Sequence, residues 1–134
     1  MSATIDGIVS DGTVAEAIGR VHKGTATTAN ATPTNVVSIT PPQDGAFFCD
    51  AHVIGDNTTT AGEDVGYTLH GMFSMVAGTL AQVSTTIKGV MEHANSVACD
   101  ADFVVLGNKI GVAVTGEAAT IYAWTAKAEI NPDY

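Results

Sequence analysis

Two cysteines and four histidines are the side chains of this sequence best suited to hold a metal ion. Cys49 and His52 stand three residues apart, which resembles half of a zinc-binding set, and Cys99 with Asp102 offers a candidate second half. Both pairs lie in runs that alternate between apolar and polar residues, as β-strands do. Because strand side chains three positions apart point to opposite faces, neither pair can bind one ion without a β-bulge. We therefore expect no metal site and no cofactor.

The sequence contains little that indicates a catalytic site. A hydrolytic nucleophile needs a serine or cysteine beside a histidine that an acid orients. No Gly-x-Ser-x-Gly turn is present, and the four histidines lie in separate segments of the chain. Asp100 and Asp102 share one face of a strand, where a solvated pair is a simpler interpretation than paired catalytic carboxylates. We expect a protein that is not an enzyme.

A polar stretch at residues 55–63 is bounded by glycines and has no large apolar residue to anchor it. Asp56, Glu63 and Asp64 offer oxygen ligands of the kind that calcium prefers, but their spacing is not that of the twelve-residue EF-hand loop. The sequence predicts a solvated loop or a mobile flap here. Whether residues 55–64 bind an ion or a glycan is left open.

The composition favours strands over helices. The chain has 134 residues, 46% hydrophobic and only 14% charged, which is enough apolar material for one core and too little charge for disorder. Its apolar residues are mainly small or β-branched and threonine is abundant, as in pleated, half-buried surfaces. So few charges leave much uncharged surface on an isolated monomer, which favours assembly.

The net charge of −9 and the five scattered basic residues exclude several partners. No basic row is present that could neutralise a run of phosphates, so nucleic acid is not expected. The same charge repels anionic membranes, and no run reaches the roughly 18 apolar residues of a spanning helix. Residues 1–7 lack the basic and apolar parts of a secretory signal, so we expect assembly in a cytoplasm, with both cysteines as free, buried thiols.

Alternating apolar residues, separated by turn-forming residues, predict about eight strands. The runs are residues 18–28, 34–40, 46–54, 65–75, 80–88, 97–106, 110–115 and 119–130. No helix of two turns and no β-α-β pattern competes with them. The sequence therefore predicts an all-β fold, an antiparallel β-sandwich of about eight strands with a jelly-roll-like form. It occupies residues 18–134, and residues 1–17 precede it as an extended arm.

Within each run, the more apolar set of alternate residues is expected to face the core. This rule places both cysteines inside. After a hairpin turn at residues 77–79, it places Val83 and Ile87 inside as well. On the outward sets, Phe48 and Met72 are large apolar residues, which indicates an interface, although burial on both sides of a sandwich explains them equally well.

Four short segments stand out as a set: ATPTNVV at 31–37, GYTLHGMF at 66–73, NKIGVAVTG at 108–116 and IYAWTA at 121–126. Together they resemble motifs of small β-sandwich domains in the virion proteins of tailed bacteriophages. The resemblance covers about residues 20–130. It implies a structural role in the virion, as a head decoration (cement) protein or as a domain of a fibre, and such domains are usually trimers.

A lone domain behind a short arm favours the first of these roles, a capsid decoration protein that stabilises the phage head by bridging capsomers. Its expected partners are itself, as a homotrimer, and the major capsid protein, in virions assembled in a host cytoplasm. The expected contact residues are Ile5, Ile8, Val9, Val14, Phe48 and Met72. The alternative is a receptor- or carbohydrate-binding module of a fibre or tail, which would use the loop at residues 55–64.

Overall fold

The computed structural model describes residues 4–5, 8–9 and 21–131 of the chain. Two short strands, β1 (Thr4–Ile5) and β2 (Ile8–Val9), pair with each other as a separate two-stranded sheet. The predicted boundary between arm and domain, at residue 17, lies outside the described residues. Residues 21–131 are almost entirely strands, joined by turns and a single 3-10 turn, η1 (Ala94–Ser96).

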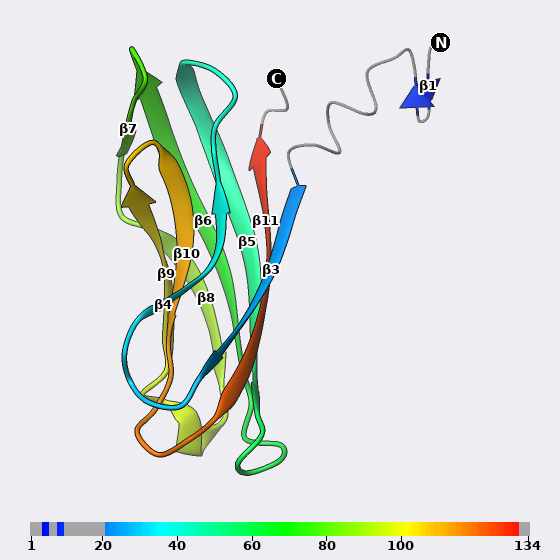
Figure 1. Cartoon of the computed structure of the whole chain (residues 1–134), viewed down its shortest axis with the longest axis vertical. Helices are drawn as coiled ribbons and strands as arrows, with labels where there is room; N and C mark the ends of the chain where they lie inside the picture. Colours follow the sequence, from blue (N-terminus) through cyan, green and yellow to red (C-terminus); the bar gives the residue numbers. More distant parts are fainter. Residues whose placement is uncertain (1–3, 6–7, 10–20, 132–134) are drawn as a thin grey trace.

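Residues 21–131 form a sandwich of two antiparallel sheets (Figure 1). The larger sheet runs in the order β3 (Val21–Thr28), β11 (Tyr122–Asn131), β5 (Gly45–Asn57) and β6 (Val65–Val76). Two short strands, β7 (Thr79–Gln82) and β8 (Ile87–Glu92), pair with successive parts of β6. The smaller sheet runs β4 (Thr34–Ile39), β10 (Lys109–Thr115) and β9 (Asp100–Leu106). The predicted all-β antiparallel sandwich is confirmed.

The core between the sheets is built by strict alternation along the long strands. In β5, β6 and β11 every second residue is buried, which confirms the predicted inward sets of residues 46–54, 65–75 and 119–130. Its largest buried side chains are aromatic: Phe47, Tyr67, Phe73, Tyr122 and Trp124. The ring of Phe73 meets the ring of Phe103 edge to face, 5.4 Å between centroids, and so joins the two sheets.

The single strand predicted over residues 80–88 is wrong in extent and in parity. It is divided into β7 and β8, which is why the sandwich has nine strands, and Gln82 donates a hydrogen bond to Thr86 across the break. Leu80 faces the core at 5% exposed, whereas Val83 and Ile87 are 55% and 69% exposed. Within β7, Leu80 is the one large apolar residue and therefore takes the core-facing position, because burial energy scales with apolar area; Val83 lies beyond the end of that strand.

Two neighbouring predictions also need correction. The connection that the sequence predicts near residues 91–95 begins two residues later, because β8 continues to Glu92. Val97, assigned to the core, is 67% exposed, because the chain turns through η1 there and β9 begins only at Asp100. Cys99, Ala101 and Phe103 are buried as predicted.

The β6–β7 hairpin turns at Ala77 and Gly78, as predicted, with φ of 49° and 79°. Both amides donate to the carboxylate of Asp44, at 3.0 and 3.1 Å. A left-handed backbone is unfavourable for alanine but is adopted readily by asparagine and glycine. The turn therefore holds local strain at Ala77.

Ala77→Asn is expected to raise the free energy of unfolding by up to about 1 kcal/mol, because asparagine tolerates the left-handed conformation. Urea denaturation measures the effect. Ala81→Asn, on an exposed position of β7, is the control that should give no gain. An unchanged or lower stability of Ala77→Asn would show that the turn is unstrained.

Thiols and phenols in the core make the fold sensitive to alkali. Burial, followed by the charges of Asp50 and Glu129, raises the pKa of Cys49 from 9.0 to about 12. Burial and then the hydrogen bond to Glu92 raise the pKa of Tyr67, and burial is also the main cause of the raised pKa of Tyr122. Protonation of each of these groups therefore favours the folded state over the unfolded chain.

A group whose pKa is raised on folding contributes its full stability below the unfolded pKa and loses it as the pH rises toward the folded pKa. For Cys49 that window runs from 9.0 to about 12. Above pH 9 we expect the thiol to cost about 1 kcal/mol of unfolding free energy per pH unit. Urea unfolding at pH 8 and pH 10.5 checks this, and Cys49→Ala should lose less stability between the two than the wild type. Equal losses would exclude the thiol as the cause.

Candidate interaction surface

The outward side chains of the six-stranded sheet form one continuous surface, here called the outer face. Across the middle of the sheet, the strand register places them in four adjacent rows. The first apolar row contains Thr25, Thr125, Ile54, Gly66 and Met91. The basic row contains Lys23, Lys127, His52, Thr68 and Gly89. The acidic row contains Val21, Glu129, Asp50, His70 and Ile87. The second apolar row contains Asn131, Phe48, Met72 and, beside Met72, Val83.

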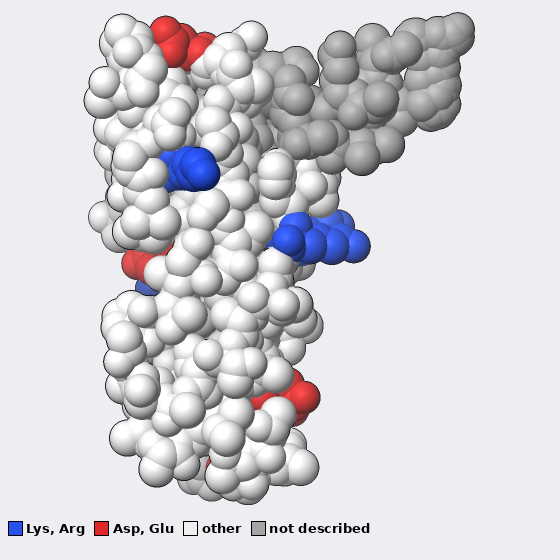
Figure 2. Space-filling view, in the orientation of Figure 1, with Lys and Arg blue, Asp and Glu red and all other residues white. Residues whose placement is uncertain are grey.

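Large apolar side chains are exposed at both ends of this pattern. Phe48 is 43% and Ile54 58% exposed on β5, and Ile87 and Met91 on β8 are 69% and 60% exposed. Placement of Phe48 outside the core agrees with the sequence prediction, and Met72 lies half-buried beside it. Charged side chains are sparse over the view of the molecule in Figure 2. Apolar groups gathered on one face indicate a surface that binds another molecule.

The basic row concentrates cations in an acidic protein. Lys127 pairs directly with Lys23 on one side and with His52 on the other. Among the described residues, neither lysine forms an ion pair with a carboxylate. Like charges directly opposite each other weaken a sheet, so the pairing of Lys127 with Lys23 costs stability.

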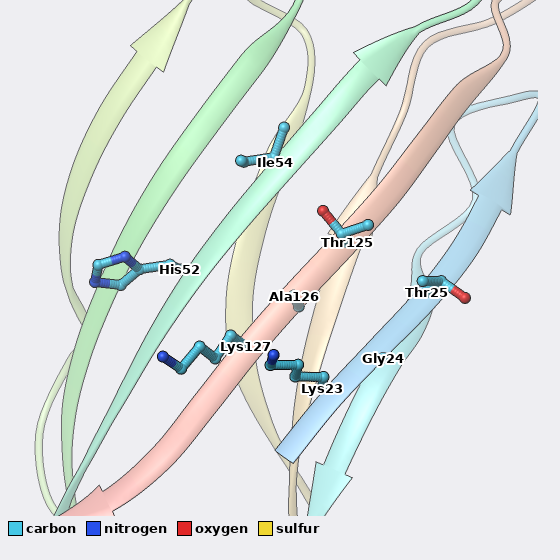
Figure 3. Close-up of a pocket in the computed structure, with 8 residues that line it drawn as sticks. All are labelled: Lys23, Gly24, Thr25, His52, Ile54, Thr125, Ala126 and Lys127. Atoms are coloured by element: carbon cyan, nitrogen blue, oxygen red, sulfur yellow. The ribbon is translucent and has the colours of Figure 1, made fainter. Parts of the chain in front are cut away.

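A hollow of about 470 Å³ opens over this part of the face (Figure 3). Lys23 and Thr25 reach it from β3, Thr125 and Lys127 from β11, and His52 and Ile54 from β5 (Figure 3). A second hollow of about 370 Å³ lies over β5, β6 and β8, where Gly89 leaves the surface without a side chain. Both hollows are open depressions of the outer face. The first has ammonium, imidazole and hydroxyl groups around an apolar floor, whereas the carboxylates of Asp50 and Glu129 also line the second.

The acidic row holds one histidine in a fixed position. His70 Nδ1 pairs with the carboxylate of Asp50, and the ring of Phe48 stacks on the imidazole with 5.0 Å between centroids. Asn131 Nδ2 donates to the other oxygen of Asp50 at 2.9 Å. An acid and a histidine are two parts of a hydrolytic triad. In residues 21–131, however, no serine or cysteine hydrogen-bonds to His70.

The metal-ligand candidates from the sequence are not brought together. Cys49 is fully buried, whereas His52 is exposed on the outer face, as the alternation of a strand requires. Over the described part of the chain, no group of three or more histidine, cysteine or acidic side chains is placed to hold an ion. Asp100 and Asp102 instead pair with Lys88, at 2.9 and 3.4 Å.

The loop predicted at residues 55–63 is shorter and more ordered than expected, because β5 continues to Asn57. Asn57 is buried and its side-chain oxygen accepts from the amides of Thr59 and Thr60. Asp64 accepts from the Asn57 amide at 3.0 Å, and Glu63 accepts from the Asn95 side chain at 3.0 Å. Two of its three carboxylates therefore help to hold the loop, and residues 58–62 are exposed, as the prediction of a solvated loop requires.

The predicted contacts in the arm are only partly described. Ile5, Ile8 and Val9 lie in the backbone pairing of β1 and β2, and Val14 lies outside the described residues. Their role as contacts stays a prediction. In the part that the structure describes, no helix has the length and apolar character needed to cross a membrane.

The basic row is the feature that the sequence did not reveal. Lys23 and Lys127 are distant in the chain, and only the insertion of β11 between β3 and β5 brings them together with His52. Spacing along the sequence carries no signal for such a row. Alternation does predict that Lys127 and His52 face outward on their own strands, but not that they lie side by side.

Comparisons with known proteins give distant likenesses. No protein-family model matches the sequence, and no curated protein matches it. Similar solved structures include the tailspike protein of Acinetobacter baumannii phage AM24, with 10% identity, a TM-score of 0.47, and coverage of 93% of this chain and 30% of that one. The tailspike protein of Acinetobacter phage vB_ApiP_P1 has 11% identity, a TM-score of 0.45, and coverage of 85% and 22%.

A third similar structure is tailspike protein gp49 from Acinetobacter baumannii bacteriophage Fri1, described as a capsular polysaccharide depolymerase. It has 20% identity and a TM-score of 0.31, and the match covers 87% of this chain and 19% of that one. This chain thus spans less than a third of each of the three tailspike proteins. With TM-scores below 0.5, the likenesses do not establish a common fold.

Proposed function

We propose that this chain is a structural module of a tailed-phage virion and that it acts by assembling through its outer face. The observation that carries the proposal is the exposure of Phe48, Ile54, Ile87 and Met91 on that one face. Complete burial of a large apolar side chain is worth roughly 1.5–3 kcal/mol. A role that depends on burial, and not on catalysis, uses this face directly.

The virion assignment is supported by the four sequence motifs. They lie in both sheets: residues 31–37 lead into β4 and 108–116 contain β10 in the smaller sheet, while 66–73 lie in β6 and 121–126 begin β11 in the larger sheet. Each motif therefore supplies a paired strand of the domain.

Such a module has two candidate locations. Decoration of the capsid, with a homotrimer and the major capsid protein as partners, is the location that the sequence predicted. The second is a tail fibre or tailspike, the description carried by the three similar structures. One observation favours the second: where the outer face is left uncovered, its hollow of about 470 Å³ offers Lys23, His52 and Lys127 to an acidic sugar.

Immunogold electron microscopy tests both the proposal and the location. Antibody raised against the purified chain is applied to virions of the phage that encodes it, with virions of an unrelated phage as control. Gold on the particles supports the proposal, on heads for decoration and on tails for a fibre or tailspike. Virions without label, in a lysate that contains the chain, would contradict it.

A further inference from the structure

We propose that the outer face is a two-fold interface between two copies of this chain. This deepens the proposed function and rests on it only in taking assembly as what the chain does. Along the strands, the four rows follow in the order apolar, basic, acidic, apolar. When a second copy is laid over the first in the reverse order, each basic row meets an acidic row and each apolar row meets an apolar row.

A two-fold axis that lies between the basic and acidic rows, in the plane of the face and across the strands, would bring each row over its complement. Lys127 then faces Glu129 of the second copy, and His52 faces Asp50 of the second copy, because these pairs lie two residues apart on β11 and β5. The axis generates each of these pairs twice. The charge of Lys127, which forms no ion pair with the described residues of its own chain, is thereby matched.

The apolar rows and the glycines fit the same axis. Ile54 faces Phe48 of the second copy, since both lie on β5 at equal distances from the axis. On β6, Gly66 and Met72 are also equidistant from it, so the methionine meets a position without a side chain. On β8, Ile87 likewise faces Gly89. Because a large side chain of one copy lies opposite a glycine of the other, the two sheets can approach to their usual separation of about 10 Å.

The other in-plane axis, along the strands, is disfavoured because it places the basic row over the basic row. The charges thus select one of the two ways in which the face can meet itself. Five strands and the four rows cover roughly 24 by 20 Å of flat sheet. Because side chains project from the sheet, the accessible surface that each copy would bury is larger than this flat area and approaches the ~800 Å² per partner of a stable interface.

Charge reversal tests the pairing. In Lys127→Glu the new carboxylate faces Glu129 of the second copy, and in Glu129→Lys two ammonium groups face each other, so each variant alone should dimerise about tenfold more weakly. A mixture of the two variants restores opposite charges at both sites. Sedimentation equilibrium of each variant, of the wild type and of the mixture should therefore show dimers in the last two.

Lys109→Glu, at the start of β10 on the smaller sheet, is the matched control for charge. It should dimerise like the wild type. In its mixture with Glu129→Lys only one of the two sites of a heterodimer has opposite charges, so that heterodimer should be weaker than the one between Lys127→Glu and Glu129→Lys. Thermal melts of each variant at low concentration confirm folding. A wild type that stays monomeric, or a mixture no tighter than the single variants, overturns the two-fold interface. Gold labelling of virions is independent of these results, so the proposed function can survive that failure.

Discussion

Trp124→Ala is expected to lower the free energy of unfolding by about 3–5 kcal/mol, the largest single effect in this protein. The indole is 1% exposed, and its Nε1 donates to Thr28 Oγ1 at 2.8 Å. Its ring packs 5.6 Å from that of Tyr122, and Gly55 leaves the space that it fills, since a Cβ there would lie 2.6 Å from Trp124 Cζ3. Alanine would leave a cavity and a buried hydroxyl without its donor.

Urea denaturation of three variants separates these causes. Trp124→Phe keeps most of the volume and should lose less than Trp124→Ala. Thr28→Val leaves the indole N–H unpaired and should cost about 1–3 kcal/mol. Thr125→Ala, exposed on the next position of β11, should be nearly neutral. A loss below about 1 kcal/mol for Trp124→Ala would show that the core is not organised around the indole.

Gly24→Ala is expected to destabilise the fold by 1–3 kcal/mol or more, because β4 crosses β3 at this point. A Cβ on Gly24 would lie 2.2 Å from the carbonyl oxygen of Val36 and 3.0 Å from the Cβ of Val37. The closest atom belongs to the backbone, so no rotamer change can relieve the overlap. One of the two sheets must shift.

The same urea series measures this change, with Gly66→Ala as the matched control. At Gly66 the nearest atom to an added Cβ is the carbonyl oxygen of Val53, at an ordinary 3.7 Å. Its substitution should leave the stability of the monomer nearly unchanged. If Gly24→Ala is as stable as Gly66→Ala, the close approach of β3 and β4 is wrong.

Strong alternation made the long strands predictable. In β6, Tyr67, Leu69 and Phe73 share one parity, and only one assignment buries all three. In β11, Trp124 fixes the inward set in the same way. The periodicity of two is a direct consequence of strand geometry, so the sequence alone predicts which residues form the core.

The sequence could not predict two features: which side chains face the core where alternation is weak, and the order of the strands in the sheet. Alternation predicts Val83 in the core because it shares a parity with Ala81 and Ile87, but β7 ends at Gln82 and Leu80 is the residue that faces the core. The outer face could be predicted only one strand at a time. Lys127 lies between Lys23 and His52 because β11 inserts between β3 and β5, and non-local pairing of this kind leaves no mark in residue spacing.

The central claim is that two copies of this chain meet through the outer face. Its most direct test is amine acetylation of the wild type over a concentration series, quantified by mass spectrometry at Lys23, Lys127 and Lys109. The account predicts that Lys23 and Lys127 become protected as the concentration rises through the dimerisation range, while Lys109 on the smaller sheet reacts equally throughout. Dimers in which all three lysines react alike, or in which Lys109 is the one protected, would contradict it.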